Sequence, residues 1–304
     1  MLYAIIDIGS STIRMAIYNI AYGKMEMLMK KKHTVGLAAY VKDDIMQQQG
    51  IDKTCDILNE FRDLLADFKI TNVSAFTTAA IRNVKNQAEV IEQIQKRTTI
   101  DVCVISGEEE AEFDFIGVVR TVGVDTGIII DVGGGSTELI YYKDAAIVKK
   151  TSIPVGALSL YTKYAEDFLP SSAEIFDMQA EIKQLLKEQL QDFPAGDKLY
   201  VCAIGGTAKS ARLLYNELFL RPDENMTMQT DKMTDIINKY KRDNPLSESL
   251  AISLLKTAPD RLKTIIPGMV IVDEVCSYFA ASEITYSDTG MREGFIYKQI
   301  IGEN

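Results

Sequence analysis

Two short stretches of the sequence are written alike: IIDIGSST at residues 5–12 and IIDVGGGST at residues 129–137. Each is typical of a buried strand that ends in an aspartate and runs into a turn of small residues before a second strand begins. The two aspartates, Asp7 and Asp131, lie 131 − 7 = 124 residues apart. A motif repeated at that distance predicts two duplicated α/β domains.

The chemistry of this motif favours a phosphate group held together with a metal ion. A turn of small residues lets backbone N–H groups converge on an anion, and hydroxyl groups add donors. A carboxylate at the end of a buried strand is costly unless it meets a cation or several donors. Magnesium, bound partly through waters and bridging to phosphate oxygens, meets that need. One glycine-rich hairpin would be weak support, because most are only turns, but two copies that each carry an aspartate favour function.

The segments around the motif also repeat. In chain order, the sequence predicts strands at 3–7, 13–19, 25–31, 73–77, 102–105, 127–131, 138–143, 146–152, 199–204 and 283–286. Helices are predicted with an apolar face at 57–68, from Asn86 with Glu89 as a capping box, from Gly107, from Ser171 or Ser172 with Glu174, three times within 230–281, and from Arg292. We therefore expect domains at 1–123 and 124–290, with a terminal helix, 291–304, that packs back on the first domain.

Composition removes several classes of protein. The formal charge of −10 argues against broad binding to nucleic acid or to an anionic membrane. His33 is the only histidine, which excludes enzymes built on a catalytic histidine and histidine-rich metal sites. No G-x-x-x-x-G-K-[ST] or G-x-G-x-x-G motif occurs. The four cysteines are far apart in the sequence, and Cys103 and Cys202 are expected in the core. No signal peptide and no apolar run of membrane length is seen. We therefore expect a cytoplasmic protein with reduced cysteines.

At this point the residues resemble a known family, the exopolyphosphatase/guanosine pentaphosphate phosphatase (Ppx/GppA) family of the actin, heat-shock 70 and sugar kinase superfamily. The matching segments cover nearly the whole chain in order and are 6–10, 77–82, 105–111, 130–139, 205–207 and 287–294. The chain is similar to the short members that lack a C-terminal HD-type extension. The resemblance implies two RNase H-like, actin-like ATPase domains with an active-site cleft between them.

The resemblance also implies roles for single residues. Glu110 matches the catalytic glutamate that orients or deprotonates water, and Arg82 matches an arginine that reaches towards the phosphate chain. Asp131 and Glu138, together with Asp7, are implied to hold Mg²⁺, with Mn²⁺ as the alternative ion. The remaining implied contacts bind phosphate, and these are Gly9, Ser10, Ser11, Thr12, Gly133, Gly134, Gly135, Ser136, Thr137, Gly206 and Thr207.

Three stretches depart from the family pattern. Ser11 stands where the family usually has an asparagine, and residues 36–40 read GLAAY where an arginine and a glutamate are usual. An Arg-Ala-Asp segment is replaced by RLK at 261–263. The first two changes bear on substrate affinity, metal stoichiometry and catalytic strength.

The sequence favours an exopolyphosphatase that releases orthophosphate from the end of inorganic polyphosphate by in-line attack of water. The alternatives are a guanosine pentaphosphate phosphohydrolase, a weakly catalytic phosphate or nucleotide sensor, and an ATP-dependent kinase or chaperone-type ATPase on the same fold. The expected partners are therefore polyphosphate or a (p)ppGpp-type small polyanion, with no nucleic acid and no membrane. A homodimer is the family's common state, although no residue here fixes an interface.

Overall fold

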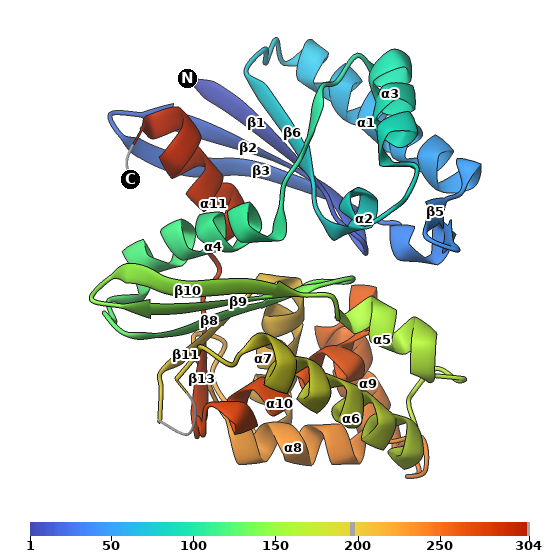
Figure 1. The fold of residues 1–304 in the computed structure, drawn as a ribbon, viewed down its shortest axis with the longest axis vertical. Coiled ribbons are helices and arrows are strands. Elements are labelled where there is room, and N and C mark those ends of the chain that lie inside the picture. Colours follow the sequence, from blue (N-terminus) through green and yellow to red (C-terminus); the bar gives the residue numbers. More distant parts are fainter. Residues whose placement is uncertain (195–197, 303–304) are drawn as a thin grey trace. The chain divides into compact units, whose positions relative to one another are not determined.

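The computed structural model describes residues 1–194 and 198–302. Contacts divide the chain into two compact units, Met1–Gly107 and Glu108–Asn304. Each unit contains one large sheet with helices packed on it (Figure 1). The predicted pair of α/β domains is therefore confirmed, whereas the predicted cleft between them stays a prediction. Within the described residues, no helix combines the length and apolar character that a membrane crossing requires.

The first unit is built on a five-stranded sheet of order β3-β2-β1-β6-β7. The first three strands form an antiparallel meander, and β6 and β7 continue the sheet parallel to β1. Helices α1 and α3 lie side by side and cover one face (Figure 1). The elements are β1 Leu2–Ile8, β2 Thr12–Ala21, β3 Lys24–Thr34, the helical turn Leu37–Tyr40, β4 Val41–Lys42, β5 Ile45–Met46, α1 Gln48–Asp67, β6 Val73–Thr77, α2 Ala79–Arg82, α3 Gln87–Thr98 and β7 Val102–Val104.

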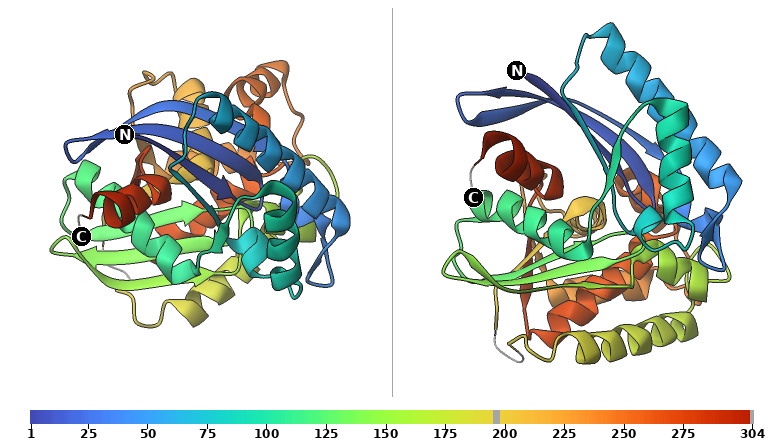
Figure 2. Two further views of the ribbon diagram at one scale, coloured as in Figure 1. Left: turned by 90° about the horizontal axis from the view of Figure 1, so that it is seen from above. Right: turned by 45° about the horizontal axis from the view of Figure 1, so that its top comes forward.

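The second unit is built on a six-stranded sheet of order β10-β9-β8-β11-β13-β12. A large apolar core joins one face of this sheet to the helices that follow β10, and α4 covers the other face (Figure 2). The elements are α4 Gly107–Val122, β8 Gly127–Val132, β9 Thr137–Lys143, β10 Ala146–Ile153, α5 Ala157–Tyr164, α6 Ser172–Gln189, β11 Val201–Ile204, α7 Gly205–Leu218, β12 Thr227–Gln229, α8 Thr230–Lys239, α9 Glu248–Thr257, α10 Ile265–Tyr278, β13 Glu283–Tyr286, α11 Met291–Phe295 and the helical turns Ile296–Ile301.

The two sheets repeat each other beyond the motif that the sequence reveals. In both, the third, second, first, fourth and fifth strands of the repeat lie in that order, and only β12 is extra. Each meander also carries a register shift at the same place, between Ile17 and Tyr18 on β2 and opposite Tyr141 and Tyr142 on β9. Counted from the paired positions Ile8–Ile13 and Val132–Thr137, these two sites are equivalent. Because a β-bulge is a specific local feature, its repetition supports a duplicated domain.

The units divide before α4, whereas the sequence predicts a boundary between residues 123 and 124. The apolar side of α4, including Ala111 and Phe115, packs on Ile129 and Ile140 of the second sheet. The terminal helix packs on α4 in turn, with Phe295 against Phe113 at 5.4 Å between ring centroids. Both helices therefore belong to the second unit by contact. Residues 303–304 of the predicted terminal helix lie outside the described residues, and the domain bounds 1–123 and 124–290 stay a prediction.

Two local predictions are wrong. A helix does begin after Asn86, but the Asn86 side chain does not cap it. Its amide instead pairs with the backbone of Met46, accepting from the N–H at 2.9 Å and donating to the carbonyl at 3.1 Å. Cys103 is exposed rather than buried, because it lies on β7 at the edge of its sheet, while Cys202 is in the core.

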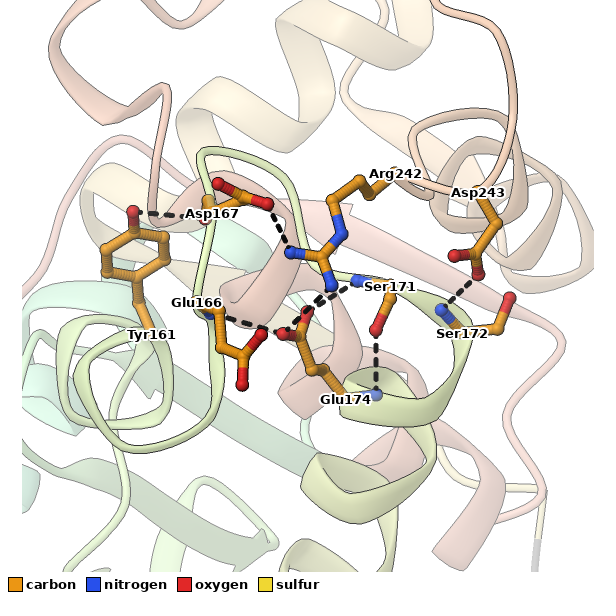
Figure 3. Close-up of polar contacts among 8 residues, drawn as sticks. All are labelled: Tyr161, Glu166, Asp167, Ser171, Ser172, Glu174, Arg242 and Asp243. Carbon is orange, nitrogen blue, oxygen red and sulfur yellow. Dashed lines mark hydrogen bonds and ion pairs between the residues drawn. The ribbon is translucent and has the colours of Figure 1, made fainter.

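The capping box predicted at the start of α6 is confirmed (Figure 3). Glu174 accepts the backbone N–H groups of Ser171 and Glu166 at 2.6 and 3.1 Å, and Arg242 lies 3.4 Å from the same carboxylate. Burial opposes the charge, but these N–H donors hold the pKa of Glu174 below its usual value. The ionised carboxylate therefore ties the loop before α6 to the helix start.

We expect Glu174→Ala to lower the free energy of unfolding by about 1–2 kcal/mol at neutral pH, because two backbone donors and an arginine lose their partner. The pKa is lower in the folded state, so this contribution is present above the unfolded pKa and is lost as the pH falls through the folded one. Urea denaturation at pH 7 and at acidic pH measures both effects. A difference between variant and wild type that does not shrink with acid would contradict the charged role, and Glu188→Ala on the same helix serves as control.

Candidate active site

Two turns of equal length hold the repeated motif. The first glycine turn, Gly9–Thr12, is closed by the N–H of Gly9 on the carbonyl of Thr12 at 3.0 Å. The second glycine turn, Gly133–Ser136, is closed by the N–H of Gly133 on the carbonyl of Ser136 at 2.9 Å. Both therefore have the same backbone bond. Ser136 is the structural counterpart of Thr12.

The first glycine turn is held by the segment that follows β3. The carbonyl of Ser11 accepts the N–H groups of Val35 and Gly36, each at 3.0 Å, and the carbonyl of Ser10 accepts that of Ala38 at 3.2 Å. This support comes from the backbone. The altered side chains of the segment therefore leave the turn's scaffold in place.

The second glycine turn is held by the N-terminus of α5. The carbonyl of Gly134 accepts the N–H groups of Leu158 and Ser159, and the carbonyl of Gly133 accepts that of Ala157, all at 2.9 Å. Three otherwise unpaired N–H groups of a helix start are thus used on the turn. Both turns have carbonyls fixed from one side, and the N–H groups of Gly9 and Gly133 close the turns. The N–H groups of the residues that follow these two glycines are therefore the candidate donors to an anion.

The predicted hydroxyl ligands of the second unit serve the fold. Thr137 and Thr207 are buried and donate to backbone carbonyls at 2.7 and 2.8 Å. The hydroxyl of Ser136 donates to Glu138 at 2.8 Å. Because these protons are already used, phosphate would have to be bound chiefly by backbone N–H groups. Phosphate binding by the three hydroxyls stays a prediction.

Four carboxylates of the second unit form an acidic cluster: Glu110 and Asp114 on α4, Asp131 one residue before the end of β8 and Glu138 near the start of β9. Asp131 is half-buried, and the other three are buried. Glu108 and Glu109 of the same helix start are exposed, while Glu110 is buried. Glu110 and Asp114 are one helical turn apart and so share a face. Asp131 and Glu138 are cross-strand partners. The structure thus brings together three of the predicted site residues, Glu110, Asp131 and Glu138.

Asp114 was missed by sequence reasoning, because one aspartate within an amphipathic helix gives no signal. It is fully buried, and neither carboxylate oxygen has a hydrogen-bond partner among residues 1–194 and 198–302. Burial, followed by the charges of Asp131, Glu110 and Glu138, raises the pKa of Asp114 well above its usual value. The nearby backbone N–H of Met291 does not form a hydrogen bond of normal geometry with Asp114, but it lowers the pKa of this carboxyl. Asp114 therefore favours its neutral form.

We expect Asp114→Asn to change how stability depends on pH. The pKa is raised on folding, so the folded state keeps a proton that the unfolded state loses, and the wild type loses up to about 1.4 kcal/mol of stability per pH unit between the two pKa values. The variant lacks this term and should gain stability over the wild type as the pH rises. Urea denaturation over a pH series without divalent metal measures it. The control is Asp177→Asn, an exposed carboxyl on α6, and parallel curves for Asp114→Asn and wild type would contradict the prediction.

A third loop meets the acidic cluster at the start of α7. Gly205 has a left-handed φ of 79°, and a Cβ there would collide with the carboxylate of Asp131. At Gly206 a Cβ would collide with the guanidinium of Arg261. Arg261 therefore lies against the loop predicted to bind phosphate. In the sequence this arginine is only part of the altered segment 261–263, since nothing there links it to Gly206.

The predicted residues of the first unit occupy the end of its sheet. Asp7 is buried one residue before the end of β1. The hydroxyl oxygen of Ser11 is buried and has no hydrogen-bond partner in the described part of the chain. Arg82, at the end of α2, donates to the carbonyl of Ile105 at 3.1 Å. Asp7 and the first turn thus lie together, while the roles of Asp7 and Arg82 stay predictions.

The donor set is suited to magnesium in one specific way. Among the described residues, no three Asp, Glu, His or Cys side chains are arranged as a metal cage. Magnesium, however, is commonly held by one or two carboxylates, and waters and substrate phosphates complete its shell. The cross-strand pair Asp131 and Glu138, beside a glycine turn, fits that pattern. These two residues could therefore hold a metal–phosphate group.

Comparisons with known proteins identify the family of the chain. The model of the Ppx/GppA phosphatase family matches residues 16–302. The chain is 26% identical to a Haemophilus influenzae protein named "Putative exopolyphosphatase", over 97% of this chain and 90% of that protein. It is 25% identical to the guanosine-5'-triphosphate,3'-diphosphate pyrophosphatase of Aeromonas hydrophila, over the whole chain and 60% of that protein. The chain thus spans less than two thirds of this longer relative.

Solved structures share the fold. A Ppx/GppA protein of Aquifex aeolicus has a TM-score of 0.78 at 24% identity, covering 100% of this chain and 99% of the other. An exopolyphosphatase from Cytophaga hutchinsonii has a TM-score of 0.83 at 21% identity, with the same coverage. The predicted actin-like, RNase H-like fold class is thereby confirmed. Because the family model covers most of the sequence, the chain belongs to the Ppx/GppA phosphatase family and is a phosphoric anhydride hydrolase.

Proposed function

We propose that the chain is an exopolyphosphatase that releases orthophosphate from the end of inorganic polyphosphate. The observation that carries the proposal is the second unit's acidic cluster, in which the buried Glu110 shares an electrostatic environment with Asp131 and Glu138 beside a glycine turn. Phosphoryl transfer needs in-line positioning and neutralisation of charge more than covalent chemistry. The relative named "Putative exopolyphosphatase", which is 26% identical to this chain, supports polyphosphate as the substrate.

Each residue has a proposed task. Glu110 orients the attacking water and accepts its proton. The N–H groups of the two glycine turns bind phosphate oxygens, and Arg261 neutralises charge on the phosphate beside Gly206. Mg²⁺, held by Asp131 and Glu138, would supply further charge neutralisation at the phosphate oxygens when bound. From the first unit, Asp7 and Arg82 are the proposed further contacts to metal and phosphate.

Two rival functions make different predictions. A guanosine pentaphosphate phosphohydrolase would keep the same chemistry with another leaving group, and the Aeromonas relative supports it. A weakly catalytic sensor would bind polyanions with turnover near background, and the altered segment after β3 supports that.

We favour a cytoplasmic location, since the four cysteines are free thiols.

Phosphate release measured with malachite green separates these functions. The substrates are long-chain polyphosphate and guanosine pentaphosphate, each with Mg²⁺, with Mn²⁺ and with EDTA. We expect metal-dependent release from polyphosphate that is faster than release from the alarmone. Preference for the alarmone would support the first rival. No release from either substrate, with binding retained in calorimetry, would support the sensor and overturn the proposal.

A further inference from the structure

Glu138 is held by two serine hydroxyl groups on the same oxygen. Its side chain is buried, and Oε1 accepts hydrogen bonds from Ser136 at 2.8 Å and from Ser152 at 2.7 Å. Ser136 belongs to the second glycine turn, whereas Ser152 comes from β10. Ser152 thus reaches Glu138 from a strand that none of the predicted site residues occupies.

The backbone places these groups in a row across three strands. On β8, β9 and β10, Asp131, Glu138 and Ser152 occupy directly paired positions. Paired positions place their side chains on the same face of a sheet, so the three groups lie next to one another. Ser152 is therefore the neighbour of Glu138 on the side away from Asp131.

Two donors on one oxygen have a physical consequence. A buried carboxylate is costly without donors, and the cost rises beside a second carboxylate such as Asp131. Hydrogen bonds to an ionised acceptor are roughly twice as strong as neutral ones. The last torsion of a glutamate is otherwise broad, so two bonds to Oε1 restrict the direction in which Oε2 points.

We propose that Ser152 is a positioning residue that acts through Glu138, fixing the carboxylate that would hold the metal of a metal–phosphate substrate. The proposal rests on the proposed function for the assignment of Glu138 as a metal ligand. Groups that orient a metal ligand from outside commonly contribute a factor of about 10–100 to metal affinity or activity. Ser152 has the position and the hydrogen bond for that role.

The test uses Ser152→Ala, which removes the hydroxyl, and Ser152→Thr, which keeps it. Thr151→Val is the matched control, because it removes a hydroxyl from the adjacent residue of β10, whose side chain alternates to the other face. Binding of Mn²⁺ to the full chain is measured by calorimetry and by electron paramagnetic resonance, with inorganic phosphate present. The Mg²⁺ concentration for half-maximal phosphate release and the melting temperature are measured alongside.

We expect Ser152→Ala to weaken Mn²⁺ binding about 10- to 100-fold and to raise the Mg²⁺ requirement by a similar factor. Ser152→Thr should restore most of both, and Thr151→Val should match the wild type. A lower melting temperature with unchanged Mn²⁺ affinity in Ser152→Ala would overturn the inference, as would failure of folded Ser152→Thr to restore binding or absence of Mn²⁺ binding by the wild type. If no substrate is hydrolysed but the Mn²⁺ series behaves as expected, the inference stands and the proposed function fails.

Discussion

Glu110→Gln should reduce the rate of phosphate release from polyphosphate by about 10²- to 10⁴-fold, the usual contribution of a positioned general base. The amide keeps the size of the side chain and one acceptor oxygen, but it cannot take a proton from the attacking water. Glu110 is the buried member of an acidic helix start and shares the acidic cluster with Asp131 and Glu138. The expected loss therefore falls on kcat rather than on substrate binding.

Glu109→Gln is the matched control, because Glu109 is the exposed neighbour in the same helical turn. It should leave kcat within a few-fold of the wild type, and phosphate release by both variants is followed with saturating Mg²⁺. Binding of polyphosphate to Glu110→Gln, measured by calorimetry, should be retained. Equal turnover by Glu110→Gln and the wild type would contradict the role of base. A loss of binding without a loss of kcat would show that Glu110 serves the substrate rather than the water.

The repeated motif was the part of the fold most accessible to the sequence. Strands β6 and β13 have the predicted bounds, because each is a short run of apolar and β-branched residues between polar turns. Strand β12 was missed because its three residues form a strand only by pairing with β13. The Asn86 capping box failed for the opposite reason, since a partner distant in sequence, Met46, took the side chain. Local sequence patterns predict strands and caps that depend on neighbouring residues. They miss strands and caps that depend on a partner distant in sequence.

The candidate site divides in the same way. Asp131, Glu138 and Glu110 could be named from the resemblance, and the structure adds that Asp131 and Glu138 are cross-strand partners. Asp114 and Arg261 could not, because their places depend on how α4 and the segment after α9 pack. The motif's hydroxyls were taken for phosphate donors, yet Ser136 donates to Glu138. The sequence can name candidate residues. The acceptor to which each hydroxyl group donates depends on the folded geometry.

Gly156→Ala is expected to lower kcat/KM for polyphosphate by about 10²-fold, the loss that a misplacement of about 1 Å can cause at a reacting centre. Gly156 has an extended backbone, with φ −140 and ψ 170, which any residue could adopt, so its conformation does not demand glycine. The lack of space at this position demands glycine, because a Cβ would lie 2.5 Å from the carbonyl oxygen of Gly134 and from the nitrogen of Gly135. These are backbone atoms of the second glycine turn. The turn or the start of α5 would have to move.

The matched control is Gly127→Ala, at the opposite end of β8, where a Cβ would lie 2.6 Å from the carbonyl oxygen of Tyr200. Both changes overpack a backbone contact in the same unit, at a stability cost of about 1–3 kcal/mol each. Only Gly156→Ala displaces the turn whose N–H groups would bind phosphate. Kinetics are measured well below the melting temperature of both variants. Equal losses of kcat/KM in the two would attribute the effect to stability, while loss confined to Gly156→Ala would show that α5 fixes the turn in its binding geometry.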